Sequence, residues 1–150
     1  MSYIDDNLMA GEQVIYRAKL HWAIFLTPIF WFIFALLFLG TESSVSGILM
    51  AFALIVSIPT FINYSSSEFG VTNKRVIGKV GFIRRSSTEL LLTRVEGIQV
   101  RQSIMGRMLG YGSVTISGTG GLKEPFHKIS NPLELRRVVQ EQITNIEDSE

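Results

Sequence analysis

The chain contains two apolar runs, WAIFLTPIFWFIFALLFLG at residues 22–40 and SSVSGILMAFALIVSIPTFINYSSS at residues 43–67. Neither run contains Lys, Arg, Asp or Glu, and Glu42 is the only charged residue between Lys19 and Glu68. An α-helix rises about 1.5 Å per residue, so roughly 20 apolar residues cross the ~30 Å hydrocarbon core of a bilayer. The alternative is a pair of core helices in a soluble protein. A chain of 150 residues is too small to bury two helices that have no polar face.

The positive charges around these runs predict an orientation. Lys and Arg flank the runs on their outer sides, whereas the connector at 41–44 has none. The flanking residues are Arg17 and Lys19 before the runs, and Lys74, Arg75 and Lys79 after them. Because positively charged flanks stay in the cytoplasm, both chain termini are predicted to be cytoplasmic. The sequence therefore predicts a multi-pass membrane protein with a transmembrane hairpin over residues 22–64, whose spans are 22–40 and 45–63.

The remaining chain divides around this hairpin. Residues 1–21 are predicted to form a flexible polar tail (1–11) and a short strand (13–19), which we expect to pair with later strands because both lie at the same membrane face. Residues 65–146 form the second soluble part, and 147–150 an acidic tail. Only three serines, 65–67, join the hairpin to that part, and three residues reach at most ~10 Å. The domain is therefore expected to stay against the cytoplasmic leaflet.

Short β-like segments follow the hairpin. Alternating apolar and polar residues, or short apolar runs next to glycine, are typical of strands. The predicted strands are 69–72, 75–80, 82–86, 88–92, 98–102, 114–117 and 126–129. Residues 103–109 instead have apolar side chains at helical spacing, which predicts one or two helical turns.

The C-terminal segment predicts an amphipathic helix. Asn131 is the expected N-cap, Pro132 takes the first helical position, and Glu134 completes a capping box. One face carries an apolar stripe of Leu135, Val138, Val139, Ile143 and Ile146. Several strands followed by one such helix predict a small barrel or sandwich closed by its C-terminal helix.

Composition excludes some chemistry. The chain has no cysteine, so it has no disulfide and no thiolate site. Its only histidines are His21 and His127, on different segments, which does not make a metal site. A Ser-His-Asp triad lacks its acid, and the loop 118–123 departs from the phosphate-loop spacing. We therefore predict no enzyme activity, no metal and no cofactor.

At this point the sequence resembles the bacterial pleckstrin-homology-like (PH-like) membrane proteins in which a two-helix hairpin precedes the PH-like domain. The resemblance depends on the motifs GE-V (11–14), VTNKRVI (71–77), IQVRQS (98–103), GR-LGYG (106–112) and NP (131–132). It implies two near-orthogonal antiparallel sheets of about seven strands, with the C-terminal helix closing one end. It also implies location in the bacterial cytoplasmic membrane, no enzyme activity and no particular ligand.

Basic residues suggest one candidate surface. Between residues 68 and 137 there are 12 Lys or Arg and 5 Glu, a local charge of 12 − 5 = +7. Anionic headgroups attract each nearby basic side chain by roughly 1 kcal/mol. The candidate headgroup contacts are Lys74, Arg75, Lys79, Arg84, Arg85 and Arg101. The alternative is that these charges only solvate a strand face. Nucleic acid is not predicted, because no aromatic residues alternate with the charges.

The segment around 103–111 suggests a second candidate surface. Its apolar side chains are expected to be core, and the alternative is a surface that binds a partner or a second copy, since methionines adapt to irregular contacts. The candidate residues are Ile104, Met105, Arg107, Met108, Leu109 and Tyr111.

Three functional hypotheses follow. The first is a non-catalytic membrane-anchored module that acts by assembly, as a homo-oligomer or with a membrane protein partner, through open sheet edges. The second is recognition of anionic lipid headgroups by the basic face. The third is an accessory subunit of a transporter or envelope-stress complex, although the predicted spans contain no ionisable residue of the kind that marks a conduction path.

Overall fold

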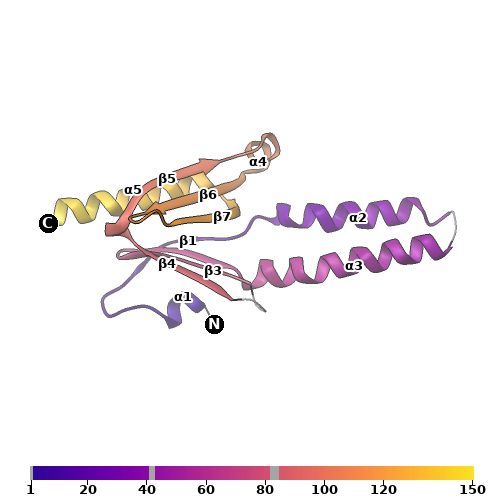
Figure 1. Ribbon diagram of the computed structural model, residues 1–150, viewed down its shortest axis with the longest axis horizontal. Coiled ribbons are helices and arrows are strands. Elements are labelled where there is room, and N and C mark those ends of the chain that lie inside the picture. Colours follow the sequence, from indigo (N-terminus) through magenta and orange to yellow (C-terminus); the bar gives the residue numbers. More distant parts are fainter. Residues whose placement is uncertain (1, 41–42, 82–84) are drawn as a thin grey trace.

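The computed structural model describes residues 2–40, 43–81 and 85–150. A β-rich domain and two long helices form an elongated molecule, with the helices extending from one end of the domain (Figure 1). The domain contains two antiparallel sheets, of four and three strands, and the C-terminal helix packs along it. The expected architecture of two antiparallel sheets with about seven strands and a C-terminal helix is confirmed.

The four-stranded sheet combines strands from both sides of the long helices. Its order is β1 (Val14–Ala18), β2 (Glu68–Thr72), β3 (Arg75–Val80) and β4 (Ser86–Leu91). Strand β1 precedes the helices and β2 follows them, yet the two pair antiparallel, with Ala18 opposite Phe69. The helices are therefore an insertion between two neighbouring strands. The predicted strand 82–86 falls mostly on residues 82–84, which lie outside the described residues.

The three-stranded sheet completes the domain. Its order is β5 (Val95–Arg101), β6 (Tyr111–Gly118) and β7 (Lys123–Ser130), with the short helix α4 (Ile104–Leu109) between β5 and β6. A single 3-10 turn, η2 (Leu92–Arg94), leads from β4 to β5. The two sheets meet where Leu20 forms a β-bridge with Ile129 and the Ser130 N–H donates to the Lys19 carbonyl at 3.0 Å.

Both sheets and helix α5 (Pro132–Ser149) enclose one core. The predicted stripe on this helix is confirmed, because Leu135, Val138 and Val139 are buried and Ile143 and Ile146 pack against the core. The strands and the segments next to them contribute Ala18, Leu20, Phe69, Val71, Val76, Leu90, Leu92, Val114, Ile116, Phe126 and Ile129.

The start of α5 differs in part from its prediction. Pro132 occupies the first turn as expected, but Asn131 adopts a left-handed conformation with φ of 50° and its side chain makes no capping hydrogen bond. The expected side-chain cap is therefore wrong. The Asn131 carbonyl instead accepts the N–H groups of Glu134 and Leu135, at 3.1 and 3.2 Å.

The long helices pack against each other and leave most of their surface uncovered. The first consists of η1 (Trp22–Phe25) and α2 (Leu26–Leu37), and the second is α3 (Ser43–Ser66). Trp31 meets Phe52 across this pair, with ring centroids 4.8 Å apart. Among the described residues one helix, at Ser44–Ser66, is long and apolar enough to cross a membrane, and only 11% of its most apolar window is buried. The helix before it, Trp22–Leu37, is apolar but shorter.

The N-terminus is folded, contrary to the flexible tail that we predicted. Residues Tyr3–Asp6 form α1, and Ile4 is only 1% exposed. Its side chain packs over Gly70 of β2, where an added Cβ would lie 2.7 Å from the Ile4 Cδ1 atom. The Ser2 hydroxyl donates to the Glu68 carboxylate at 2.9 Å, which fixes the same segment to the sheet.

Prediction for Gly78. A Cβ atom on Gly78 of β3 would lie 2.4 Å from the Phe126 ring, which is itself held by an edge contact with Phe69. We expect Gly78→Ala to lower the free energy of unfolding by about 1–3 kcal/mol, as overpacking does, in thermal or urea unfolding of the detergent-solubilised chain. The control is Gly97→Ala in β5, where no atom lies within 4 Å of the new Cβ. Equal stability of the two variants would contradict this packing.

Candidate functional site

The two chain segments that join the domain to the long helices lie side by side. Because Ala18 and Phe69 are paired, residues 19–21 leave the sheet next to the point where residues 64–67 return to it. We call this end of the domain the hairpin end, and the opposite end the far end. At the hairpin end, the His21 N–H donates to the Lys128 carbonyl at 2.8 Å, so β7 also holds the outgoing segment.

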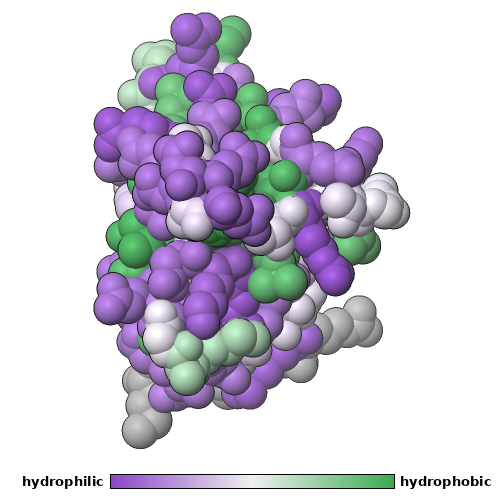
Figure 2. All heavy atoms as spheres, turned by 90° about the vertical axis from the view of Figure 1, so that its left-hand side faces the viewer, coloured by the Kyte–Doolittle hydropathy of each residue, from purple (hydrophilic) through white to green (hydrophobic). Residues whose placement is uncertain are grey.

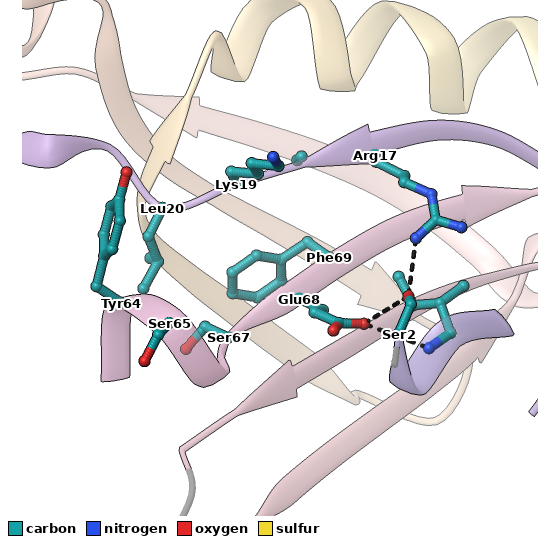
Figure 3. A pocket seen from close by; sticks show the side chains of 11 residues that line it. Ser2, Arg17, Lys19, Leu20, Tyr64, Ser65, Ser67, Glu68 and Phe69 are labelled. Carbon is teal, nitrogen blue, oxygen red and sulfur yellow. Dashed lines mark hydrogen bonds between the residues drawn. The ribbon is translucent and has the colours of Figure 1, made fainter. Parts of the chain in front are cut away.

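A pocket of about 390 Å³ lies at the hairpin end between β1, α1 and the end of α3 (Figure 3). Its wall combines the apolar side chains of Leu20 and Phe69 with the polar ends of Tyr64 and Ser65. Ser67 also lines it, is 7% exposed, and its hydroxyl has no hydrogen-bond partner among the described residues. A buried hydroxyl without a partner is costly, so this group favours a polar ligand or water in the pocket.

Charges along the rim of this pocket are only partly neutralised. Arg17 forms an ion pair with Asp5 and donates to the Ser2 hydroxyl at 2.8 Å. Ser2 in turn donates to Glu68, so these groups satisfy one another. Lys19 is exposed and forms no ion pair within the part of the chain that the structure describes. It is therefore free to bind an anion.

Three of the predicted headgroup residues also lie at the hairpin end. Lys79 stands opposite Glu68 in the sheet, with its ammonium 5.1 Å from the Tyr3 ring centroid. Arg85 precedes β4 and Arg101 ends β5, and both are exposed. Arg84 lies outside the described residues. The structure thus brings Lys79, Arg85 and Arg101 to the end that carries Lys19, a residue that we had not selected.

Lys74 and Arg75 lie elsewhere, because β2 and β3 carry them to the far end. Lys74 is exposed and its ammonium donates to the Ala10 carbonyl at 3.0 Å. Arg75 is only 4% exposed, so its predicted contact with headgroups is wrong. A buried guanidinium is not accessible to a lipid headgroup.

Arg75 instead joins the N-terminal segment to the sheet. Its guanidinium contacts both carboxylate oxygens of Glu12, at 3.0 and 3.1 Å, and also pairs with Glu89. The Asn7 carbonyl accepts from the same guanidinium at 2.6 Å, and the Thr72 hydroxyl donates to Glu12 at 2.7 Å. We call the Glu12–Arg75–Glu89 group the far-end clasp. The sequence signal for it was an arginine that opens a strand, directly before the apolar residues Val76 and Ile77.

The clasp determines the charge state of Glu12. Burial alone would raise its pKa, but hydrogen bonds from Arg75, the Met9 N–H and Thr72, together with the positive charge of Arg75, outweigh burial and lower the pKa. Glu12 is therefore ionised in the folded protein, and the buried arginine keeps its counter-charge.

Helix α4 presents the second candidate surface. The expectation that its apolar side chains belong to the core is wrong for three of them, since Ile104, Met105 and Met108 are 82%, 54% and 80% exposed. Leu109 and Tyr111 are half-buried and Arg107 is exposed. The helix packs through Gly106, where a Cβ would lie 2.5 Å from the Tyr111 carbonyl oxygen.

Catalytic chemistry has little support in this geometry. The Ser113 hydroxyl lies 3.2 Å from His127 Nδ1 on the exposed face of the second sheet, but no described carboxylate is bonded to that imidazole. Glu124, three residues before His127 on β7, instead accepts a hydrogen bond from the Thr88 hydroxyl at 3.2 Å. Among the described residues no group of three or more His, Cys, Asp or Glu is placed to hold a metal ion.

The fold defines a PH-like module, a class that generally binds lipids or proteins and is generally non-catalytic. The chain belongs to the Bacterial PH domain family, whose model matches residues 24–143 and so includes all of α2 and α3. The recognised PH-like character of the sequence is thereby confirmed. Neither the comparison with curated proteins nor the comparison with solved structures gives a match.

Prediction for the far-end clasp. Since the pKa of Glu12 is lower in the folded chain than its ordinary value of 4.5, its contribution to stability is complete above that pH and is lost as pH falls through the folded pKa. We expect Glu12→Gln to lower the free energy of unfolding at neutral pH by about 3–5 kcal/mol, because it leaves a buried guanidinium without its main partner. The variant should also lose less stability than the parent between neutral pH and pH values below 4.5, as measured by urea unfolding.

The matched control is Glu89→Gln. Glu89 is the second partner of Arg75, and the Glu89 side chain is 39% exposed. Water is able to replace this exposed partner, so the free energy of unfolding should fall clearly less than in Glu12→Gln. The variant should still lose as much stability as the parent when the pH falls below 4.5. Equal effects of the two variants would contradict the assignment of Glu12 as the buried partner.

Proposed function

We propose that this chain is a two-pass membrane protein whose PH-like domain is held against the cytoplasmic leaflet and binds anionic lipid headgroups at the hairpin end. The observation that carries the proposal is the insertion of two apolar, uncovered helices between the paired strands β1 and β2. If these helices lie in a bilayer, the domain has no flexible linker by which to move away from it. The proposed location is the bacterial cytoplasmic membrane, with both termini in the cytoplasm.

The lengths of the two helices support this arrangement. The span Ser44–Ser66 has 23 residues, or about 35 Å, enough for the ~30 Å hydrocarbon core. The 4 residues of η1 and the 12 of α2 together rise about 26 Å. Bilayers accommodate a shortfall of a few ångströms by local thinning. Uncovered apolar side chains also favour lipid contact, since Leu37, Ile48 and Ile55 are 73%, 69% and 67% exposed.

Lipid headgroups are the proposed ligand because unpaired cations gather at the same end. Lys19, Arg85 and Arg101 are exposed and form no ion pair with any residue that the structure describes. The pocket beside Lys19 adds the unpartnered Ser67 hydroxyl as a donor. A phosphate group accepts hydrogen bonds from both types of group.

Assembly is the second candidate function, and open sheet edges favour it. Among the described strands, β4 pairs only with β3, and β5 only with β6. Each of these strands presents a free edge that a strand from a second copy or from a membrane protein partner is able to extend. An accessory role in a transporter or envelope-stress complex is one form of this candidate.

Prediction for topology. The chain has no cysteine, so single-cysteine variants report position without background. With a membrane-impermeant maleimide, Ser44→Cys in the first turn of α3, next to the connector, should react in intact cells of a bacterial expression host. Ser149→Cys near the C-terminus should react only after the membrane is permeabilised. Labelling of Ser149→Cys in intact cells would contradict cytoplasmic termini.

Prediction for lipid selectivity. In reconstituted full-length protein, spin-labelled phosphatidylglycerol should be immobilised more than spin-labelled phosphatidylcholine. Each neutralised cation should weaken this preference by about 1 kcal/mol. The triple variant Lys19→Gln, Arg85→Gln, Arg101→Gln is therefore expected to lose the preference.

The matched control neutralises three exposed cations of the far end, by Lys74→Gln, Arg94→Gln and Lys123→Gln. It removes the same net charge and should keep the preference, because charges beyond the ~8–10 Å screening length act weakly on the bilayer. A similar loss in both triple variants would attribute the preference to net charge and would contradict a headgroup site.

A further inference from the structure

We propose that helix α4 is a third membrane contact, in which Ile104, Met105 and Met108 lie in the interfacial layer of the same leaflet that the hairpin enters. The inference rests on the proposed function, since it takes the bilayer to begin where the long helices leave the domain. It assigns a role to apolar side chains that the core leaves uncovered.

The position of α4 is the first argument. Along the long axis of the molecule, α4 stands level with the domain-side ends of α2 and α3 (Figure 1). Contact also links α4 to the start of the long helices. Tyr111 comes two residues after α4, and the centroid of its ring lies 5.2 Å from that of His21, the residue before η1. A bilayer that surrounds the two long helices therefore meets α4 at its surface.

The second argument is that α4 is held rigidly with its apolar face outward. The Ser103 side chain caps its first turn by accepting the Gly106 N–H at 3.0 Å. Gly110 ends it in a left-handed conformation with φ of 84°, and its carbonyl accepts the Asn131 N–H at 3.1 Å. Because both ends are fixed and Gly106 packs against β6, the exposure of Met108 is a property of the fold.

The third argument is the polarity of the surroundings. Arg101 at the end of β5 and Arg107 within α4 are both exposed, and cationic residues close to an apolar helical face are typical of an interfacial helix near anionic headgroups. At the far end, hydrophilic residues cover most of the surface (Figure 2). Three large apolar side chains side by side on a two-turn helix are thus concentrated where the membrane is expected.

Site-directed fluorescence quenching tests the inference. Met108→Cys in the otherwise cysteine-free full-length chain carries an environment-sensitive fluorophore, and the protein is reconstituted at low density in vesicles of phosphatidylcholine and phosphatidylglycerol. Lipids with a nitroxide near the headgroup should quench this label several-fold more than one at Leu122→Cys. Leu122 is the matched control, because it is an exposed apolar residue, 57% exposed, in the β6–β7 turn at the far end.

A third label at Ile55→Cys separates this inference from the proposed function. Ile55 lies in α3 and should be quenched by a nitroxide deep in the acyl chains. Quenching at Ile55 without quenching at Met108 overturns the membrane contact of α4 and leaves the hairpin in place. Absence of quenching at Ile55 overturns both. The emission of the label at residue 108 also reports whether that position is shielded from water. If this shielding disappears when the protein is diluted in lipid, the apolar face binds a second copy, and the inference is overturned.

Discussion

The pairing of β1 with β2 is the constraint on which the rest of the structure depends. Ala18 and Phe69 are cross-strand partners, so their Cα atoms lie about 5 Å apart although the whole helical insertion separates them in sequence. Closing such a long loop costs conformational entropy unless the loop is already folded. The antiparallel helices bring β1 and β2 next to each other. The folded helical hairpin therefore lowers the entropy cost of pairing these strands, and the paired strands in turn fix the ends of the hairpin.

The far-end clasp complements this constraint at the other end of β1. The strand is short, running from Val14 to Ala18, and lies at the edge of its sheet. Its C-terminal end continues into the helical insertion, while Glu12 ties its N-terminal end to Arg75 on β3. A buried ion pair contributes little net stability, but loss of one partner is strongly unfavourable. The clasp thus selects one register for a strand that has only one neighbour.

The periodicity of apolar residues predicted most of the helices and strands, but it did not predict the contacts between residues that are distant in sequence. Strong local patterns, such as the apolar stripe of α5, identify an element and its buried face together. In contrast, Ile4 is buried because Gly70, distant in sequence, leaves space for it, and no local pattern reports that contact. Arg75 shows the same limit, since its burial depends on Glu12 from the other side of the insertion.

Helix α4 shows how the surroundings change the meaning of a pattern. Its helical spacing of apolar residues is typical of a core element, yet the core contact is made by Gly106, where a side chain would not fit. In a soluble domain, the uncovered Ile104 and Met108 would form an aggregation-prone patch. Next to a bilayer the same apolar patch would contact lipid instead of water. The arrangement of α4 is therefore consistent with a domain whose solvent differs at its two ends, and with a hairpin end that faces lipid.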